Sequence, residues 1–219
     1  MTEQEIIDKI SKPATLFKVG GFKPSEEKNS SWFGKVLLSK EGEKWPEYNG
    51  NLLTPLCQLN ISSLPYKPDE LKEIVFMTVF IDENGLNKST NKTVIVRTYK
   101  SLEDLVELEQ PNYNSSIKPF QLEPYLEKND CPTWDDCPMK IPEEFEENYE
   151  IHFENKAGIK IGGWPSLIQG EIFLESNDAE YIFQIDSIEK ANWQWGDGGV
   201  GYFAKDSKTQ NWLFEWQCY

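Results

Sequence analysis

The chain has 219 residues and a formal net charge of −15, and 38% of its residues are hydrophobic, including 8 Trp, 9 Tyr and 12 Phe. A chain this acidic would repel a polyanion, which argues against nucleic acid as a partner. No run reaches the roughly 18–20 apolar residues of a membrane-spanning helix. Residues 1–5 are acidic where a secretory signal would be basic and then apolar, so we expect a cytoplasmic protein with no membrane partner.

The first half of the chain contains a Gly-Gly motif, Lys18-Val19-Gly20-Gly21-Phe22, followed by apolar runs at residues 56–60 and 75–82. These runs are rich in β-branched and aromatic residues and are bounded by Gly, Pro, Asn and Asp, which predicts strands. A further strand is predicted over residues 93–98. Residues 101–108 open with a capping-box pattern, a serine with an acid three residues later, which predicts a short helix.

The middle of the chain is rich in proline and acid. Residues 110–139 hold five prolines and little periodicity, so we expect a long connection that packs over the sheet through its aromatic residues. A second helix is predicted from Pro142 to about Gly158, because proline at the first position and acids in the first turn favour a helix start. Residues 123–154 carry eleven acids and two lysines, a net charge of −9.

The second half of the chain repeats elements of the first in the same order. Lys160-Ile161-Gly162-Gly163-Trp164 matches the first Gly-Gly motif, and the apolar runs at residues 182–186 and 200–206 match the two earlier runs. A last strand is predicted over residues 212–217, where three aromatic residues alternate onto one face that we assign to the core.

This order predicts one domain over residues 1–219, mainly β and at the margin α+β. Its two repeats, about residues 16–100 and 156–219, are joined by the proline-rich, acidic segment 101–155. We expect an internally duplicated, pseudo-twofold, barrel-like sheet with two or three short helices.

The residues that could hold a metal are few. Cys131 and Cys137 are separated by five residues, more than in a zinc knuckle, and no second pair of cysteines completes a tetrahedron. The single histidine, His152, is interpreted as a helix surface residue in preference to a catalytic base, because no nucleophile is signalled beside it. We therefore expect no metal and no cofactor, and we lean against an enzyme.

Four segments carry a family resemblance: residues 161–169, 183–186, 195–203 and 216–219. Through them the chain resembles the YwqG-like family, a bacterial domain of unknown function. The resemblance implies a mainly β fold with internal pseudo-symmetry and no reaction. It also implies a role in immunity, since some relatives are encoded beside polymorphic toxins. The first copy departs from the pattern, because Lys23 separates Phe22 from Pro24.

Two polar patterns could belong to a site. Trp195-Gly196-Asp197-Gly198-Gly199-Val200-Gly201 is rich in glycine but fits neither phosphate-binding fingerprint, so we interpret it as a turn with positive φ in which Asp197 caps local amides. Gln58 with Asn60, and Gln184 with Asp186, could line a groove shared by the two halves. They could equally satisfy backbone groups where the strands leave the sheet, which is the interpretation we favour.

Two functions remain open. The leading hypothesis is a non-enzymatic protein-binding module, with an acidic surface at Glu143, Glu144, Glu146 and Glu147 that binds a basic protein such as a toxin. The alternative is a small-molecule or enzymatic site in a cleft between the halves. The candidate lining residues of that cleft are Gln58, Trp164, Gln184, Asp186, Trp195 and Asp197.

Overall fold

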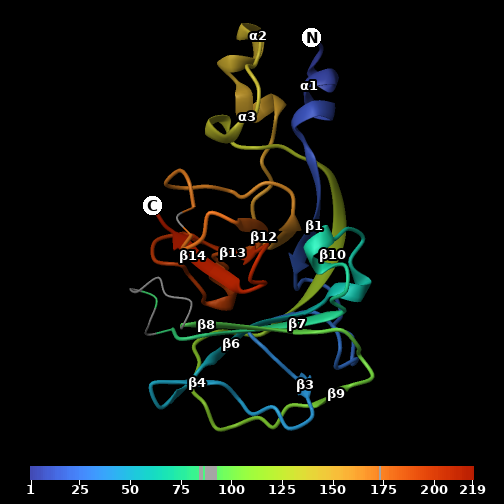
Figure 1. Ribbon diagram of the computed structural model, residues 1–219, viewed down its shortest axis with the longest axis vertical. Coiled ribbons are helices and arrows are strands. Elements are labelled where there is room, and N and C mark those ends of the chain that lie inside the picture. The colour runs from blue at the N-terminus through green and yellow to red at the C-terminus, as the bar shows by residue number, and fades with distance from the viewer. Residues whose placement is uncertain (84–85, 87–92, 173) are drawn as a thin grey trace.

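The computed structural model describes residues 1–83, 86, 93–172 and 174–219 (Figure 1). Its main element is a ten-stranded sheet with the order β14-β13-β12-β11-β1-β10-β2-β6-β7-β8, and every neighbouring pair of strands is antiparallel. In chain order its strands are β1 (Lys12–Val19), β2 (Trp32–Phe33), β6 (Thr54–Asn60), β7 (Phe76–Ile81), β8 (Val94–Tyr99), β10 (Phe120–Asp130), β11 (Lys160–Gly162), β12 (Ala179–Asp186), β13 (Val200–Asp206) and β14 (Trp212–Gln217).

The sheet consists of a central pair of strands and two wings. The centre is β1 with β10; the first wing is β2, β6, β7 and β8, and the second wing is β11, β12, β13 and β14. The wings form two facing layers, the second wing above the first in Figure 1. One hydrophobic cluster takes buried residues from both layers, among them Leu59 and Val79 of the first wing and Ile185 and Phe203 of the second. The prediction of a mainly β, barrel-like sheet is confirmed.

The two wings have matching registers. Gln58 of β6 lies opposite Trp32 of β2, and Gln184 of β12 lies opposite Lys160 of β11. In both β6 and β12 a β-bulge interrupts the ladder two residues before the glutamine. At the centre β1 pairs with β11, and β10 pairs with β2, so each wing is joined to a central strand from the other half of the chain. The strand order is therefore symmetric about the central pair, as the predicted duplication requires.

The Gly-Gly motifs do not occupy matching places in this symmetry. Gly20 follows the central strand β1, whereas Gly162 ends β11 of the second wing. By register, the counterpart of Gly162 is Gly34, directly after β2. Gly34 and Gly162 have φ of 70° and 76°, and a Cβ would lie 2.7 Å from Ile117 at the first and 2.5 Å from Tyr66 at the second. The sequence match between the two Gly-Gly motifs was therefore misleading.

Two predictions for the middle of the chain are wrong. Residues 101–108 form a turn and then β9 (Leu105–Glu107), which pairs with β3 (Leu38–Lys40). The hydroxyl of Ser101 accepts from the amide of Glu103, two residues on, and not from Asp104 as a capping box requires. The expected connection over residues 110–139 contains β10, an eleven-residue central strand. A second small ladder joins β4 (Glu47–Tyr48) and β5 (Asn51–Leu52). The predicted strands at residues 56–60, 75–82, 93–98, 182–186, 200–206 and 212–217 are confirmed within three residues at their ends.

A helical knob, which we define as residues 1–11 and 131–155, stands at one end of the molecule, at the top of Figure 1. It contains α1 (Glu3–Ile10), α2 (Glu143–Glu146) and α3 (Tyr149–His152), so the helix predicted from Pro142 is broken into two short pieces. α1 begins with a capping box in which the hydroxyl of Thr2 accepts from the amide of Glu5 at 3.2 Å. Among the described residues, no helix has the length and apolar composition needed to cross a membrane.

The knob has a small hydrophobic core of its own. Ile6 and Ile10 of α1 pack there with Tyr149 and Phe153, apart from the main cluster between the wings. α1 was not predicted from the sequence, although Thr2 and Glu5 have the spacing of a capping box.

Candidate functional site

Gln58 is fully buried in the first wing and all of its polar atoms have partners. Its Oε1 accepts from the backbone amide of Leu37 at 2.7 Å, and its Nε2 donates to the carbonyl oxygens of Lys28 and Ser30 at 2.8 and 2.6 Å. The side chain therefore supports two loops of the first wing, as the structural interpretation of this glutamine predicted.

Gln184 does the same in the second wing. Its Oε1 accepts from the amide of Ser166 at 2.8 Å, and its Nε2 donates to the carbonyl of Gly158 and to the hydroxyl of Ser166, both at 3.1 Å. By register Gly158 corresponds to Ser30, so the two glutamines bind equivalent carbonyl groups. This repeated contact is the clearest trace of duplication in the side chains.

An ion pair that the sequence analysis missed lies where the knob joins the second wing. The side chains of Asp130 and Lys160 are fully buried, and Nζ lies 2.9 Å from Oδ2. Asp130 also accepts from the backbone amides of Lys156 and Trp164 at 2.8 and 2.7 Å. Burial raises the pKa of Asp130 and lowers the pKa of Lys160, while the attraction between the two charges opposes both shifts. Through these bonds Asp130 holds the residues just before and just after β11.

Asp186 and Asn60 end the two matched strands and hold local turns. Asp186 accepts from the amides of Gly158 and Ser187 at 3.1 and 2.7 Å, and burial raises its pKa against the effect of these bonds. Asn60 accepts from the hydroxyl of Ser62 at 2.6 Å. Both side chains are half-buried. Asn60 bonds within the turn that follows its strand, whereas Asp186 also holds the loop before β11 through the amide of Gly158.

The two predicted site tryptophans lie in different surroundings. Trp164 donates from Nε1 to the carbonyl of Ile10 at 2.8 Å, and Nζ of Lys12 lies 3.5 Å from its ring centroid, so it belongs to the base of the knob. Trp195 is fully buried in the main core and packs edge-on against Trp193 at 4.9 Å.

Asp197 is exposed in the turn before β13, between Gly196 and Gly198, which both have φ of 62°. The glycine-rich block is therefore the predicted turn with positive φ. Of the six residues proposed to line a cleft, Trp164, Gln184 and Asp186 share the surroundings of residues 156–166. Gln58 lies in the first wing, Trp195 lies in the main core, and Asp197 lies at the surface.

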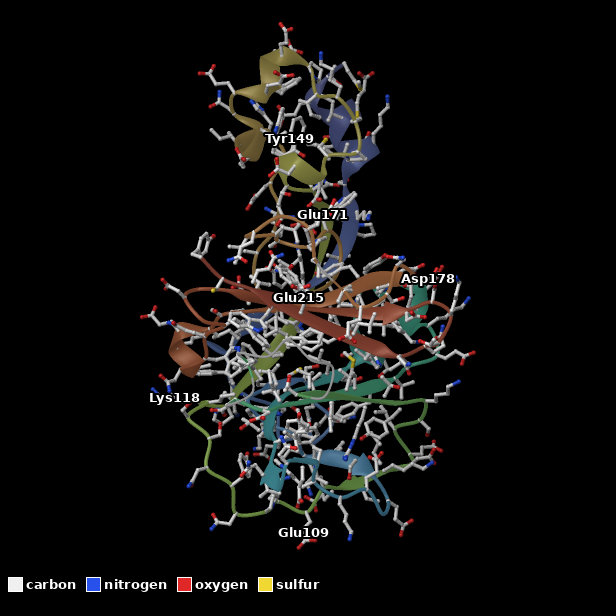
Figure 2. All side chains as sticks on the ribbon, turned by 60° about the vertical axis from the view of Figure 1, so that its left-hand side comes forward. Glu109, Lys118, Tyr149, Glu171, Asp178 and Glu215 are labelled. Carbon is white, nitrogen blue, oxygen red and sulfur yellow. The ribbon has the colours of Figure 1, made fainter. Side chains whose placement is uncertain are left out.

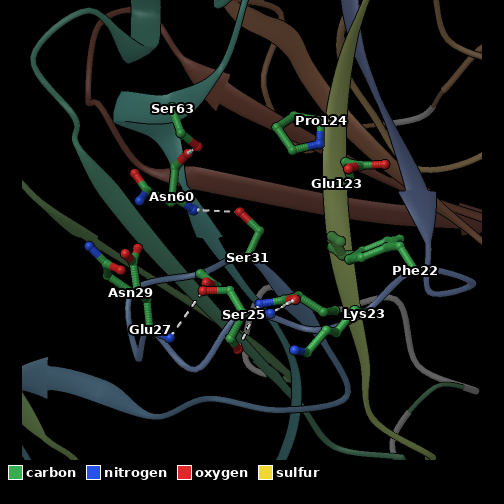
Figure 3. Close-up of a pocket in the computed structure, with 13 residues that line it drawn as sticks. Phe22, Lys23, Ser25, Glu27, Asn29, Ser31, Asn60, Ser63, Glu123 and Pro124 are labelled. Carbon is green, nitrogen blue, oxygen red and sulfur yellow. Dashed lines mark hydrogen bonds between the residues drawn. The ribbon is translucent and has the colours of Figure 1, made fainter.

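A polar hollow of about 300 Å³ lies beside the central strand β10 (Figure 3). Around it the hydroxyl of Ser31 accepts from the amide of Asn60 at 2.9 Å, and Oε1 of Gln121 accepts from the amide of Ser25 at 2.6 Å. These polar groups therefore serve the local fold. Within the described part of the chain, no group of three His, Cys, Asp or Glu side chains could hold a metal ion.

The four glutamates predicted to face a partner are all exposed on or beside α2: Glu143, Glu144, Glu146 and Glu147. The same knob exposes three large apolar side chains, Ile151 at 79%, Met1 at 48% and Trp134 at 43%. His152 lies on α3, with Nδ1 3.2 Å from a carboxylate oxygen of Glu3 and its ring against Phe145. These contacts agree with the interpretation of His152 as a helix surface residue.

A family model described as a domain of unknown function, DUF1963, matches residues 31–218. The chain belongs to the DUF1963 family. The DUF1963 match takes in both wings and β10 but begins after α1 and β1, so one of the two central strands lies outside it. No curated protein matches the chain.

Proposed function

We propose that this DUF1963 protein is a non-enzymatic protein-binding module whose helical knob binds a basic partner protein. The knob carries eleven acids against two lysines, a net charge of −9 out of the −15 of the whole chain. The acids are Glu3, Glu5, Asp8, Asp135, Asp136, Glu143, Glu144, Glu146, Glu147, Glu150 and Glu154. This concentration of charge on a projecting element is the observation that carries the proposal, because it attracts a cationic protein and speeds the encounter.

The exposed apolar side chains of the knob supply apolar contact area, which charged side chains do not provide. Protein interfaces combine an apolar centre with a polar rim, and large aromatic side chains often carry much of the binding energy. Trp134 and Ile151 are exposed on the same knob as the glutamates. Figure 2 shows the knob projecting from the rest of the molecule, with Tyr149 labelled in it. We propose that they are the apolar contacts of the interface and that the acids select a basic partner.

The finer role that we propose is immunity against a basic bacterial toxin, acting in the cytoplasm. The resemblance of residues 161–169 and 195–203 to the YwqG-like family supports this role, since some of those relatives are encoded beside toxins. All four cysteines are free thiols, which fits a reducing compartment.

The test captures partners of the whole protein from its native cell extract at low salt and then measures the affinity of each purified partner. In the test variant Glu143, Glu144, Glu146 and Glu147 are all replaced by Lys. The matched control carries the same replacement at Glu26, Glu27, Glu41 and Glu47, which are exposed in the first half of the chain.

We expect the knob variant to bind at least about tenfold more weakly, roughly 1.4 kcal/mol, and the control variant to bind as the wild type does. Rising salt should weaken the wild-type complex, because ions screen exposed charges. Equal binding by the knob variant and the wild type, or a partner with no net positive charge, would contradict the proposal.

A further inference from the structure

Two cysteines of the helical knob share its small hydrophobic core, and the interface proposed above uses neither of them. Cys131 is 2% exposed in the cluster that also holds Tyr149, and the half-buried Cys137 packs against that cluster. Both are free thiols. The remaining two cysteines lie elsewhere, Cys57 in the main cluster between the wings and Cys218 beside the glycine-rich turn before β13. The knob therefore brings together two of the four cysteines of the chain.

The chain turns back on itself between these two cysteines. It forms a short 3₁₀ turn, η3 (Trp134–Asp136), in which the amide of Asp136 donates to the carbonyl of Thr133 and the amide of Cys137 to the carbonyl of Trp134, both at 3.2 Å. The hydroxyl of Thr133 also donates to Oδ2 of Asp136 at 3.0 Å. The turn returns Cys137 to the core in which Cys131 is buried.

Both thiols lie near one buried hydroxyl group. The hydroxyl of Tyr149 donates to the carbonyl of Pro132 at 3.1 Å. Burial raises the pKa of Tyr149, and the Cys137 thiol, which is hydrogen-bonded to the hydroxyl, and the Cys131 thiol raise it further. Burial raises the pKa of Cys131 to about 11, with smaller contributions from Asp130 and from Cys137. Each thiol therefore acts on the other and on the same phenol, which requires the two sulfur atoms to be close.

We propose that Cys131 and Cys137 are the site of a reversible disulfide that forms when the protein meets hydrogen peroxide. Cys137 reacts first, because its side chain is only half-buried, whereas Cys131 is enclosed in the core. The turn between them carries Trp134, whose ring packs edge-on against Tyr149 at 5.2 Å. The cross-link therefore restrains the position of an exposed aromatic side chain.

The reaction has two steps. The thiolate of Cys137, having lost its proton to water, attacks one oxygen of hydrogen peroxide. The S–O bond forms, the O–O bond breaks, and hydroxide leaves and takes up a proton to give water. The sulfur of Cys131 then bonds to the sulfur of this sulfenic acid, the S–O bond breaks, and the hydroxyl leaves with the proton of Cys131 as a second water. Two thiols lose two electrons and two protons to one peroxide, and a dithiol reductant reverses the change by thiol–disulfide exchange.

The surroundings favour this oxidant and this product. Hydrogen peroxide is neutral, whereas the negative charge of the knob repels an anionic oxidant such as glutathione disulfide. A sulfenic acid with a resolving cysteine beside it condenses to a disulfide. Because Cys131 lies in the same small core, it reaches the sulfur of Cys137 without any unfolding of the wings.

The test exposes the whole protein to hydrogen peroxide, removes the excess with catalase, and unfolds the protein in N-ethylmaleimide. We expect the reduced protein to take up four maleimides and the oxidised protein two, with four restored by dithiothreitol. Cleavage before Asp135 and Asp136 cuts the chain between Cys131 and Cys137, so the two pieces should stay joined only in the oxidised sample. Four maleimides after peroxide, the loss of a single one, or a cross-link that contains Cys57 or Cys218 overturns the proposal.

Single variants test the order of the two steps. Cys131→Ser should form no disulfide and should accumulate a sulfenic acid at Cys137, which dimedone labels. Cys137→Ser should take up at least about tenfold less dimedone, because the remaining knob thiol is buried and has a raised pKa. Cys218→Ser is the matched control and should form the same disulfide as the wild type does. Equal labelling of the two knob variants contradicts the assigned order, and if either variant does not fold, the maleimide count on the wild type decides the question.

This modification goes beyond the function proposed for the knob, because no partner takes part in it. The variant with four lysines on and beside α2 keeps both cysteines and should form the same disulfide. The two proposals can therefore fail independently.

Discussion

The two wings of the sheet share one backbone plan but differ in what their glutamines face. Gln58 and Gln184 make equivalent bonds to loop carbonyls and amides, and both follow a bulge. Opposite Gln58 stands the half-buried Trp32, with Nζ of Lys35 4.8 Å from its ring, whereas opposite Gln184 stands the fully buried Lys160. The two wings therefore share the buried glutamine but not the residue paired with it. That residue is a half-buried tryptophan in the first wing and the lysine of a buried ion pair in the second.

The largest effect that would test this difference is expected at Asp130. Asp130→Ala leaves Lys160 as an uncompensated buried charge and removes the acceptor of two backbone amides, so the free energy of unfolding should fall by about 3–5 kcal/mol. Urea unfolding at pH 7 measures the change. The double variant Asp130→Ala with Lys160→Met should recover a large part of the loss, because an apolar residue replaces the stranded charge. A loss under about 1 kcal/mol for the single variant would mean that water reaches Lys160.

The next effect compares the wings directly. Gln58→Met and Gln184→Met keep the length of the side chain but leave buried backbone groups without partners, so each should lower the free energy of unfolding by about 1–3 kcal/mol. The two losses should be similar, and they should add in the double variant because the residues lie in different wings and share no partner. A loss confined to one wing would break the equivalence drawn from the register.

The smallest effect concerns the end of β13, where Asp206 has its pKa lowered to about 2 by hydrogen bonds from the Ser176 hydroxyl and from the amides of Thr209 and Lys208. A lowered carboxyl pKa stabilises the fold fully above the unfolded value, near 3.9, and loses that contribution as the pH falls toward 2. The difference in stability between the wild type and Asp206→Asn should therefore be constant from pH 7 to about 4 and shrink below it. Urea unfolding at stepped pH measures it, with Ser176→Ala expected to give part of the effect. A difference independent of pH down to 3 would rule out this origin.

Much of the fold could be predicted from the sequence, because the wings consist of apolar runs whose period and order repeat. The strand at residues 200–206 and the aromatic face of residues 212–217 follow from alternation alone. The match between the two Gly-Gly motifs did not mark equivalent positions, because glycine is favoured wherever a turn needs a positive φ. One motif follows the central strand β1 and the other ends the wing strand β11.

The strand β10 was missed because Pro124 interrupts it. The amide of Leu122 donates toward the first wing, to the carbonyl of Ser31, so the nitrogen of Pro124, two residues on, faces the same side. β2 pairs only with residues 120 and 121 of β10, so no strand of the described chain faces the nitrogen of Pro124 on that side. On the other side β10 pairs with β1, and that ladder does not need an N–H from Pro124. Proline in this strand is compatible with pairing only because of a tertiary arrangement that a single sequence does not display.

The candidate site could be predicted only in part. Burial of the two glutamines followed from their matched positions, and the exposed glutamates followed from local composition. The Asp130–Lys160 pair joins residues thirty positions apart, on either side of the knob, and only the register of β10, β1 and β11 brings them together.

The exchange of central strands between the halves has a consequence for how the chain is made. β1 has no strand partner among the described residues of the first hundred, since the strands beside it are β10 and β11. A chain emerging from the ribosome therefore holds an unpaired N-terminal strand until residue 130 is available, and β2 likewise waits for β10 on one side. β6, β7 and β8 can pair early, but closure of the sheet through β1 and β10 depends on contacts distant in sequence. This dependence slows folding and lengthens the period in which bare strand edges invite aggregation or chaperone binding.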